Sequence, residues 1–426
     1  TGCSELHPVE PDEDSSGAPA VETATMDGIA ERYVRLALAF SAYDGDYVDA
    51  YFGPEEWRAE AGAVKRPLET LKAEATTLIE TLAAMEPESA QVDRLRRSLL
   101  SKRLIAMRVR MGMAAGIKLS FDQETEQLFD VRVPDYDAAH FQGILEQIDA
   151  LIPGSDPLHE RVTAFQSNFV IPKDRLKRVF DRAIAECRKR TLTHLSLPQS
   201  ENFEVEFVND KPWSGYNWYK GDYFSLIQIN TDLPIYIKRA VDLGCHEAYP
   251  GHHTYNILLE RDLQKGRGWM EFTINPLYGP QSPISEGSAN FGIDMAFPGN
   301  ERAIFEKEVL FPLAGLGPGE ADRYYRLLEL LDQLSYADND AARDYLDGKI
   351  SRADTIDWIV AYRLYSLERA SQRVDFIEKY RSYVINYNYG KDLVERYVET
   401  RAGDDAERRW AEFERVLSLP LTPSDM

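Results

Sequence analysis

Four side chains that could bind a metal ion or accept a proton lie within the stretch CHEAYPGHHT, residues 245–254. They are His246, Glu247, His252 and His253. The chain has seven histidines in 426 residues, and three of them fall between positions 246 and 253. Zinc hydrolases bind the ion through neutral imidazole nitrogens and a carboxylate, and a further carboxylate takes a proton from the attacking water. The stretch therefore indicates hydrolytic zinc chemistry.

The spacing of these histidines does not fit a regular helix. In a His-Glu-x-x-His motif the two imidazoles lie four residues apart on one helical face. Here His252 would lie about 9 Å from His246 along the axis and roughly 120° away from its face, and His253 about 10.5 Å away. Pro250 lacks a backbone N–H group, and Gly251 tolerates unusual backbone angles. Together they predict a bulge or break that brings one late histidine back beside His246.

The third ligand is expected to be an acid from a neighbouring helix. Glu286 lies downstream of the histidines, where the segment Ser285-Glu286-Gly287-Ser288-Ala289-Asn290-Phe291 begins an apolar helical stretch. An acid near a helix start also has a structural explanation, because it interacts favourably with the helix dipole. Beside the histidines, Glu286 is the leading candidate. The break must absorb two residues to bring in His252 and three to bring in His253, so we favour His252 and leave both open.

Helical periodicity dominates the chain from Met26 onward, with apolar residues repeating every three or four positions. It is clear in residues 29–40, 68–82, 92–113, 141–151 and 175–192. We interpret residues 26–197 as a helical scaffold region and residues 198–426, which carry the metal motif, as the catalytic region. Both are expected to pack as one large unit.

The pattern changes to that of strands after Pro198. Residues 203–208 alternate apolar and acidic side chains, and residues 223–230 are rich in strand-forming types, so each predicts a strand. The aromatic residues between them are interpreted as sheet packing, with a substrate-contacting wall as the alternative. The expected fold is mainly α with a small antiparallel β-sheet next to the active-site helix.

Composition narrows the classes of partner. The chain has 71 acidic and 49 basic residues, a net charge of −22. This argues against a nucleic-acid partner, which requires a basic surface. No apolar run is long enough to span a bilayer. With only three cysteines, no disulfide framework is expected, and Cys245 is interpreted as a small buried residue rather than a redox centre.

The first residues have the features of a lipid-anchored protein. Thr1-Gly2-Cys3 resembles the end of a bacterial lipoprotein signal, in which the cysteine receives the lipid. Residues 4–25 are rich in Pro, Ser, Ala and acids and contain no Lys or Arg, so they cannot form a core. We expect residues 1–25 to be a disordered acidic tether with lipid on Cys3. The membrane is then contacted through this anchor alone, in the bacterial cell envelope, on its periplasmic or outer-membrane face.

The eight residues from His246 to His253, followed by Glu286-Gly287-x-Ala289, resemble the bacterial domain of unknown function numbered 885. That family is grouped with the gluzincin metallopeptidases. The resemblance covers most of the chain after the tether and implies a gluzincin-like architecture with bound zinc. It implies that His246, Glu286 and either His252 or His253 are metal ligands, and that Glu247 is the general base.

The family also has a late tyrosine before a glycine, which Tyr387 matches in the segment Asn386-Tyr387-Asn388-Tyr389-Gly390. By this resemblance Tyr387 could donate a hydrogen bond to the oxyanion, with a packed tyrosine as the alternative. The asparagines and Gly390 predict that the segment is a loop.

The sequence thus predicts a zinc-dependent hydrolase of peptide (amide) bonds that acts on short peptides. The alternative is a catalytically impaired lipoprotein that binds peptides or partners and keeps a vestigial metal site. Two departures from the family pattern support this alternative. Ser288 and Phe291 stand where the family has an aromatic pair, and residues 338–342 lack a histidine that the family often has.

Overall fold

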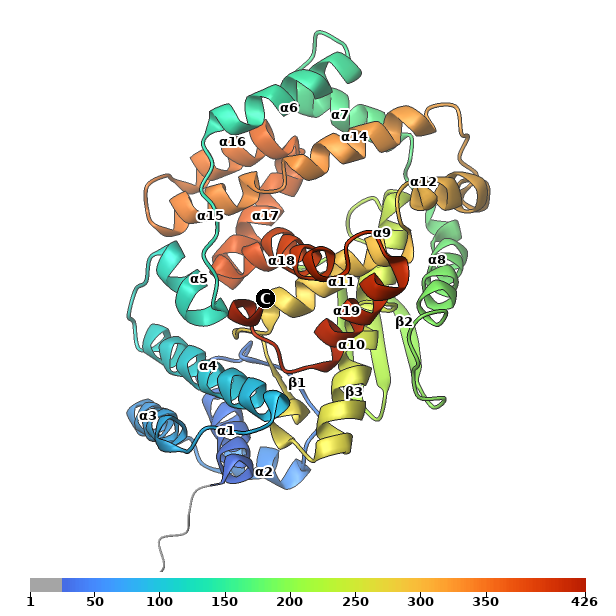
Figure 1. Cartoon of the computed structure of the whole chain (residues 1–426). Helices are drawn as coiled ribbons and strands as arrows, with labels where there is room; N and C mark the ends of the chain where they lie inside the picture. Colours follow the sequence, from blue (N-terminus) through green and yellow to red (C-terminus); the bar gives the residue numbers. More distant parts are fainter. Residues whose placement is uncertain (1–24) are drawn as a thin grey trace, which may run out of the picture.

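The computed structural model describes residues 25–426, which form a mainly helical protein with two small β-sheets (Figure 1). The mainly α prediction is confirmed. Apart from Thr25, the expected tether and the lipid site at Cys3 lie outside the described residues. Thr25 caps the first helix, because its hydroxyl accepts a hydrogen bond from the Gly28 amide at 3.1 Å. None of the helices between residues 25 and 426 is long and apolar enough to cross a bilayer.

The first part of the chain forms helices that bury one apolar face each, as their periodicity predicts. They are α1 (Met26–Phe40), α2 (Glu55–Ala63), α3 (Leu68–Ala84), α4 (Gln91–Ala114), α5 (Phe121–Phe129), α6 (Ala138–Leu151), α7 (Leu158–Ser167) and α8 (Leu176–Thr191). Along α1, for example, Tyr33, Leu36 and Phe40 have no exposed surface.

The later helices surround the candidate site. They are α9 (Lys238–Glu247), α10 (His252–Leu259), α11 (Ser282–Ala296), α12 (Glu301–Phe305), α13 (Phe311–Ala314), α14 (Ala321–Gln333), α15 (Ala337–Leu346), α16 (Arg352–Arg363), α17 (Leu367–Tyr380), α18 (Ile385–Ala402) and α19 (Ala406–Ser418). One buried cluster joins Phe40 and Met107 to Val374 and Ile377. The two predicted regions therefore share a core, while the assignment of one as scaffold and the other as catalytic stays a prediction.

Strands β2 (Asn202–Val208), β3 (Gly215–Gly221) and β4 (Phe224–Asn230) form the larger sheet, in the order β2-β4-β3. The prediction of an antiparallel sheet is wrong for one pair, because β2 and β4 run parallel. The aromatic connection between them is itself the strand β3, so the chain reverses direction twice. β3 pairs antiparallel with β4 and forms one edge of the sheet. A second sheet pairs β1 (Val48–Tyr51) with β5 (Ile274–Pro276).

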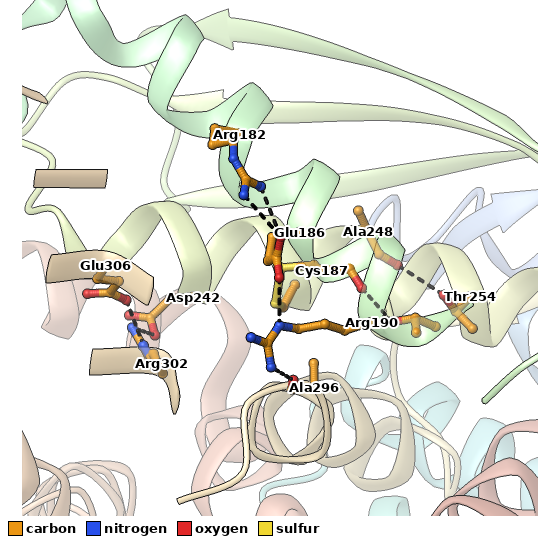
Figure 2. The surroundings of a disulfide bond; sticks show 12 residues. Arg182, Glu186, Cys187, Arg190, Asp242, Ala248, Thr254, Ala296, Arg302 and Glu306 are labelled. Atoms are coloured by element: carbon orange, nitrogen blue, oxygen red, sulfur yellow. Dashed lines mark hydrogen bonds and ion pairs between the residues drawn. A yellow bond between two sulfur atoms is a disulfide. The ribbon is translucent and has the colours of Figure 1, made fainter. Parts of the chain in front are cut away.

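A disulfide bond joins Cys187 of α8 to Cys245 of α9, 58 residues apart in sequence. Cys245 is fully buried, as expected of a small buried residue, but its disulfide partner was not expected. Tertiary packing of α8 against α9 brings the two cysteines together, and local sequence carries no signal of that packing. Figure 2 shows the polar contacts around the bond, in which Arg190 of α8 donates to the carbonyl oxygen of Ala296 in α11. The disulfide thus ties the helix that carries His246 to its neighbour.

Candidate metal centre

A break between α9 and α10 supplies both candidate histidines. His246 lies in the last turn of α9, and His252 is the first residue of α10. The chain between them contains a cis peptide bond at Tyr249–Pro250, and the Gly251 amide donates to the carbonyl oxygen of Cys245 at 3.0 Å. A Cβ atom at Gly251 would lie 1.8 Å from the carbonyl oxygen of His246, so only glycine fits. The break therefore absorbs the two extra residues.

Three side chains from α9, α10 and α11 converge on one point. Nε2 of His246 lies 3.2 Å from Oε2 of Glu286, and Nε2 of His252 lies 3.5 Å from the same oxygen. One ligand atom from each of the three residues lies within 4.8 Å of the others. The two imidazole rings are 4.6 Å apart and nearly perpendicular. The structure therefore brings together His246, His252 and Glu286.

Neighbouring polar groups orient all three side chains. Nδ1 of His246 lies 2.9 Å from Oδ1 of Asn290, and Nδ1 of His252 lies 3.2 Å from Oγ of Ser285. The hydroxyl of Tyr383 donates to Oε1 of Glu286 at 2.7 Å. Because these contacts occupy Nδ1 of each ring and Oε1 of the carboxylate, both Nε2 atoms and Oε2 are left to face each other. Outer hydrogen bonds of this kind are typical of metal-binding histidines and carboxylates.

This donor set fits a zinc ion. Two imidazole nitrogens and one carboxylate oxygen are the protein ligands of many catalytic zinc sites, which keep a fourth position open. Glu286 is 7% exposed, yet its Oε2 has no hydrogen-bond partner among the described residues. A buried oxygen of this kind is costly unless a ligand satisfies it. Burial raises the pKa of Glu286, but His252 and His246 outweigh burial and hold the pKa below its ordinary value.

His253 lies apart from this cluster. Its ring is fully buried, with Nδ1 2.8 Å from Oγ of Ser225 and Nε2 3.1 Å from Oε2 of Glu201. Tyr249 also donates to Glu201, and Arg188 pairs with it. Both ring nitrogens of His253 are therefore engaged in a polar network between α10 and the sheet, and burial lowers the pKa of this histidine.

Glu247 lines the same cavity as His246, with a buried side chain whose Oε2 has no hydrogen-bond partner within residues 25–426. Burial raises the pKa of Glu247 to about 7, against the opposing charge of His246. Strand β3 passes so close that a Cβ atom on Gly215 would lie 2.8 Å from Oε1 of Glu247. Glycine at this position leaves room for the carboxylate. An unpaired carboxyl group with a pKa near neutrality has the properties of a general base.

Tyr387 lies in the first turn of α18, so the prediction of a loop there is wrong. Gly390, which suggested the loop, instead allows α18 to approach α11, because a Cβ atom on Gly390 would lie 2.3 Å from the carbonyl oxygen of Pro283. The Tyr387 ring lies 6.5 Å from the ring of His246 and lines the cavity. Burial raises the pKa of Tyr387 well above its ordinary value, so its hydroxyl stays protonated.

His246, His252, Glu286, Glu247 and Tyr387 line one cavity of about 1130 Å³. Four further residues of the site went unnoticed in the sequence: Asp49, Ser285, Asn290 and Tyr383. Asn290 lies four positions after Glu286, so helical spacing could have identified it. Asp49 offers no such signal, because it comes from β1, nearly two hundred residues before the histidines. Burial raises the pKa of Asp49 to about 7.

No protein-family model and no curated protein matches the sequence. Among solved structures, the chain is similar to one described as a candidate lipoprotein from Colwellia psychrerythraea. The two are 13% identical, the alignment covers 92% of this chain and 76% of that one, and the TM-score is 0.49. A candidate lipoprotein of unknown function from Shewanella oneidensis is 12% identical, with 95% and 87% covered and a TM-score of 0.46.

Proposed function

We propose that the protein is a zinc-dependent hydrolase that cleaves peptide bonds in short peptides. The observation that carries the proposal is the convergence of His246, His252 and Glu286 beside the unpartnered carboxylate of Glu247. The first three residues would hold the ion. When bound, zinc supplies a Lewis acid that polarises a carbonyl group and activates water.

Glu247 is the general base in this proposal. Because Oε2 of Glu247 has no competing hydrogen bond, it can accept the proton of the attacking water and pass it to the leaving amine nitrogen. Tyr387 keeps its proton and lies beside the His246 ring, so its hydroxyl can donate to the developing oxyanion. Asn290 and Ser285 hold the two imidazoles in orientation throughout.

The edge of the sheet supports a peptide as substrate. β3 pairs with β4 on one side alone within the described residues, and its segment Gly215–Asn217 lines the cavity beside Glu247. An extended peptide can add to such an edge through main-chain hydrogen bonds that do not depend on its sequence. A strand-like substrate laid along β3 would bring a peptide bond next to Glu247.

A gluzincin-like architecture, and membership of the domain of unknown function 885, belong to the same proposal. They are supported by a base directly after the first histidine and a glutamate ligand on the next long helix. We also propose a lipid-anchored protein of the bacterial cell envelope. The Cys187–Cys245 bond supports this location, because disulfides persist in oxidising compartments such as the periplasm.

Metal content and turnover together test the proposal. The purified chain should contain about one zinc per molecule and hydrolyse short peptides, and His246→Ala should lose the zinc. Glu247→Gln should keep the zinc and lose hydrolysis, because a carboxamide cannot accept the proton. Normal turnover by Glu247→Gln would contradict the mechanism. A chain that binds peptides, but does not bind zinc and does not hydrolyse the peptides, would favour the alternative of a binding lipoprotein with a vestigial site.

A further inference from the structure

One wall of the cavity is cationic, although the chain as a whole has a net charge of −22. Helix α17 and the residue that caps it present one face to the cavity, with residues spaced three or four apart: Ser366, Arg369, Arg373, Phe376 and Tyr380. Arg363, at the end of α16, lines the same wall. The arginines lie toward the start of α17 and the aromatic rings lie toward its end.

The three arginines differ in their hydrogen-bond and ion-pair partners. Arg363 donates to the carbonyl oxygen of Leu331 at 3.0 Å and to the hydroxyl of Tyr365 at 3.1 Å, so it has structural partners. Asp338 lies 3.2 Å from Arg363 and 3.3 Å from Arg373, so these two arginines share one carboxylate.

Arg369 has no carboxylate partner within residues 25–426, and its guanidinium group lies 4.7 Å from the ring of Tyr365. It lies one helical turn before Arg373, and like charges at this spacing destabilise a helix. Within the described residues, the ion pairs of these three arginines involve one carboxylate, that of Asp338. An anion from outside would complete the arrangement.

Lys238 adds to the positive charge at the cavity. It is the first residue of α9, it lines the cavity, and it has no ion pair among the described residues. Burial lowers the pKa of Lys238, and Arg369 is among the cations that lower it further, against the opposing effect of Asp242. Lys238 and Arg369 thus line the same cavity from two different helices, α9 and α17.

A row of aromatic rings connects the arginines to the metal centre. Arg373 lies 4.9 Å from the ring of Phe376, which lies 6.2 Å from Tyr387, which in turn lies 6.5 Å from His246. Tyr380 lies 6.2 Å from Tyr383, which donates to Glu286, so this end of α17 lies beside the metal centre. Along α17, Tyr380 is about 10 Å from Arg373 and about 16 Å from Arg369. An extended peptide covers about 3.3–3.6 Å per residue, so these lengths correspond to roughly three to five residues.

We propose that Arg369 and Arg373 bind a carboxylate of the peptide substrate, three to five residues away from the bond that is cleaved. The carboxylate is either the free carboxyl end of the peptide or an acidic side chain. The position of cleavage rests on the proposed hydrolase function, whereas the carboxylate site stands on the arginines alone.

Binding to the full-length Glu247→Gln chain tests the site without turnover. Titration calorimetry compares acetylated hexa-alanine with a free carboxyl end, the same peptide amidated, and amidated versions that carry one glutamate or one glutamine. A peptide with a carboxylate should bind about tenfold or more tightly than its neutral counterpart, as expected for a charge-assisted hydrogen bond. Preference for the free end identifies the terminal carboxylate, and preference for glutamate over glutamine identifies a side chain. Equal affinities for all four peptides would overturn the proposal.

Arg369→Gln in the same background should remove this preference and leave the affinity for neutral peptides unchanged. Arg369 has no ion pair to lose, so this variant is expected to fold, and its melting temperature checks that it does. Arg326→Gln is the matched control, because Arg326 is exposed on α14 and outside the cavity. A preference that survives Arg369→Gln would also overturn the site.

Two further outcomes separate this inference from the proposed function. If the wild-type chain hydrolyses no peptide but the carboxylate preference holds, the hydrolase proposal fails and the arginine site stands. If the chain hydrolyses peptides but shows no preference for a carboxylate, the arginine site fails and the hydrolase proposal stands. Where both hold, mass spectrometry of the products should locate the cut three to five residues from the carboxylate, and a cut elsewhere would contradict the spacing.

Discussion

Asn290 bridges His246 and the backbone of Tyr387. Its amide nitrogen donates to the Tyr387 carbonyl oxygen at 2.9 Å, and its Oδ1 lies 2.9 Å from Nδ1 of His246. A carbonyl oxygen can only accept, so the orientation of the amide is determined and Oδ1 must face the imidazole. Oδ1 also only accepts, so Nδ1 of His246 carries the proton. Nε2 is then left with a free lone pair, which is the state that a metal ion requires.

The Asn290→Ala variant should therefore bind zinc about 10- to 100-fold more weakly than the wild type, as the loss of such an outer hydrogen bond typically does. Competition with a chelating dye measures the affinity. Asn256→Ala is a suitable control, because Asn256 lines the same cavity but donates only to the backbone of His252. Equal zinc affinities for the Asn290 and Asn256 variants would contradict the orienting role of Asn290.

The disulfide between Cys187 and Cys245 should stabilise the chain measurably. A double variant with serine at both positions should lose about 2–4 kcal/mol of unfolding free energy, since the bond closes a loop of many residues. Urea denaturation measures the loss. Dithiothreitol should lower the stability of the wild type by a similar amount and leave the double variant unchanged. A variant as stable as the oxidised wild type would show that the bond does not constrain α8 and α9.

The helices were predictable because a buried helical face leaves its period in the local sequence, as in Tyr33, Leu36 and Phe40. The pairing of the strands in the sheet was harder to predict. Whether β2 pairs with β3 or with β4 depends on contacts between whole strands, and the aromatic residues of β3 conceal its alternation. Local pattern thus predicted the strand segments at residues 203–208 and 223–230 but not their direction.

The candidate site also has features that local sequence predicts and features that depend on tertiary packing. The approach of His252 to His246 could be inferred because Pro250 and Gly251, which permit it, lie between them. The loop prediction at Gly390 was wrong for a related reason. A glycine in the sequence can indicate a loop or a position where a partner helix comes close. Only the tertiary position of Gly287 distinguishes these two cases. Asp49 reaches the cavity through tertiary packing, which leaves no trace near the motif.

Asp242 should make stability depend on acidic pH. Burial raises its pKa, but Arg302, Lys238 and Arg239 outweigh burial and hold it below the ordinary 3.8. Figure 2 shows its contact with Arg302, which is 2.7 Å long. Between the two pKa values the unfolded chain binds more protons than the folded one, so this contribution is complete above about pH 4 and is lost as the pH falls further.

The Asp242→Asn variant should be less stable than the wild type at pH 7, by about 2 kcal/mol, because it removes one of the two carboxylates, Asp242 and Glu306, that pair with Arg302. It should also lose less stability than the wild type when the pH falls from 5 to 2. Urea midpoints across this range provide the measurement. If the urea midpoints of the two proteins fell in parallel as the pH decreases, the pKa of Asp242 would not differ between the folded and unfolded chains.

His252 and His253 are adjacent in sequence, but the structure gives them opposite surroundings. His252→Ala should abolish zinc binding with little loss of stability, because the polar contacts of its ring within residues 25–426 are with Glu286 and Ser285, which belong to the same site. His253→Ala should keep about one zinc per chain but lose roughly 2–4 kcal/mol, because it removes a fully buried ring and leaves the hydroxyl of Ser225 without the imidazole, while Glu201 keeps Tyr249 and Arg188. Metal analysis and urea denaturation on the same samples separate the two effects. The reverse pattern would make His253 the ligand and would require α10 to begin one residue later than the structure has it.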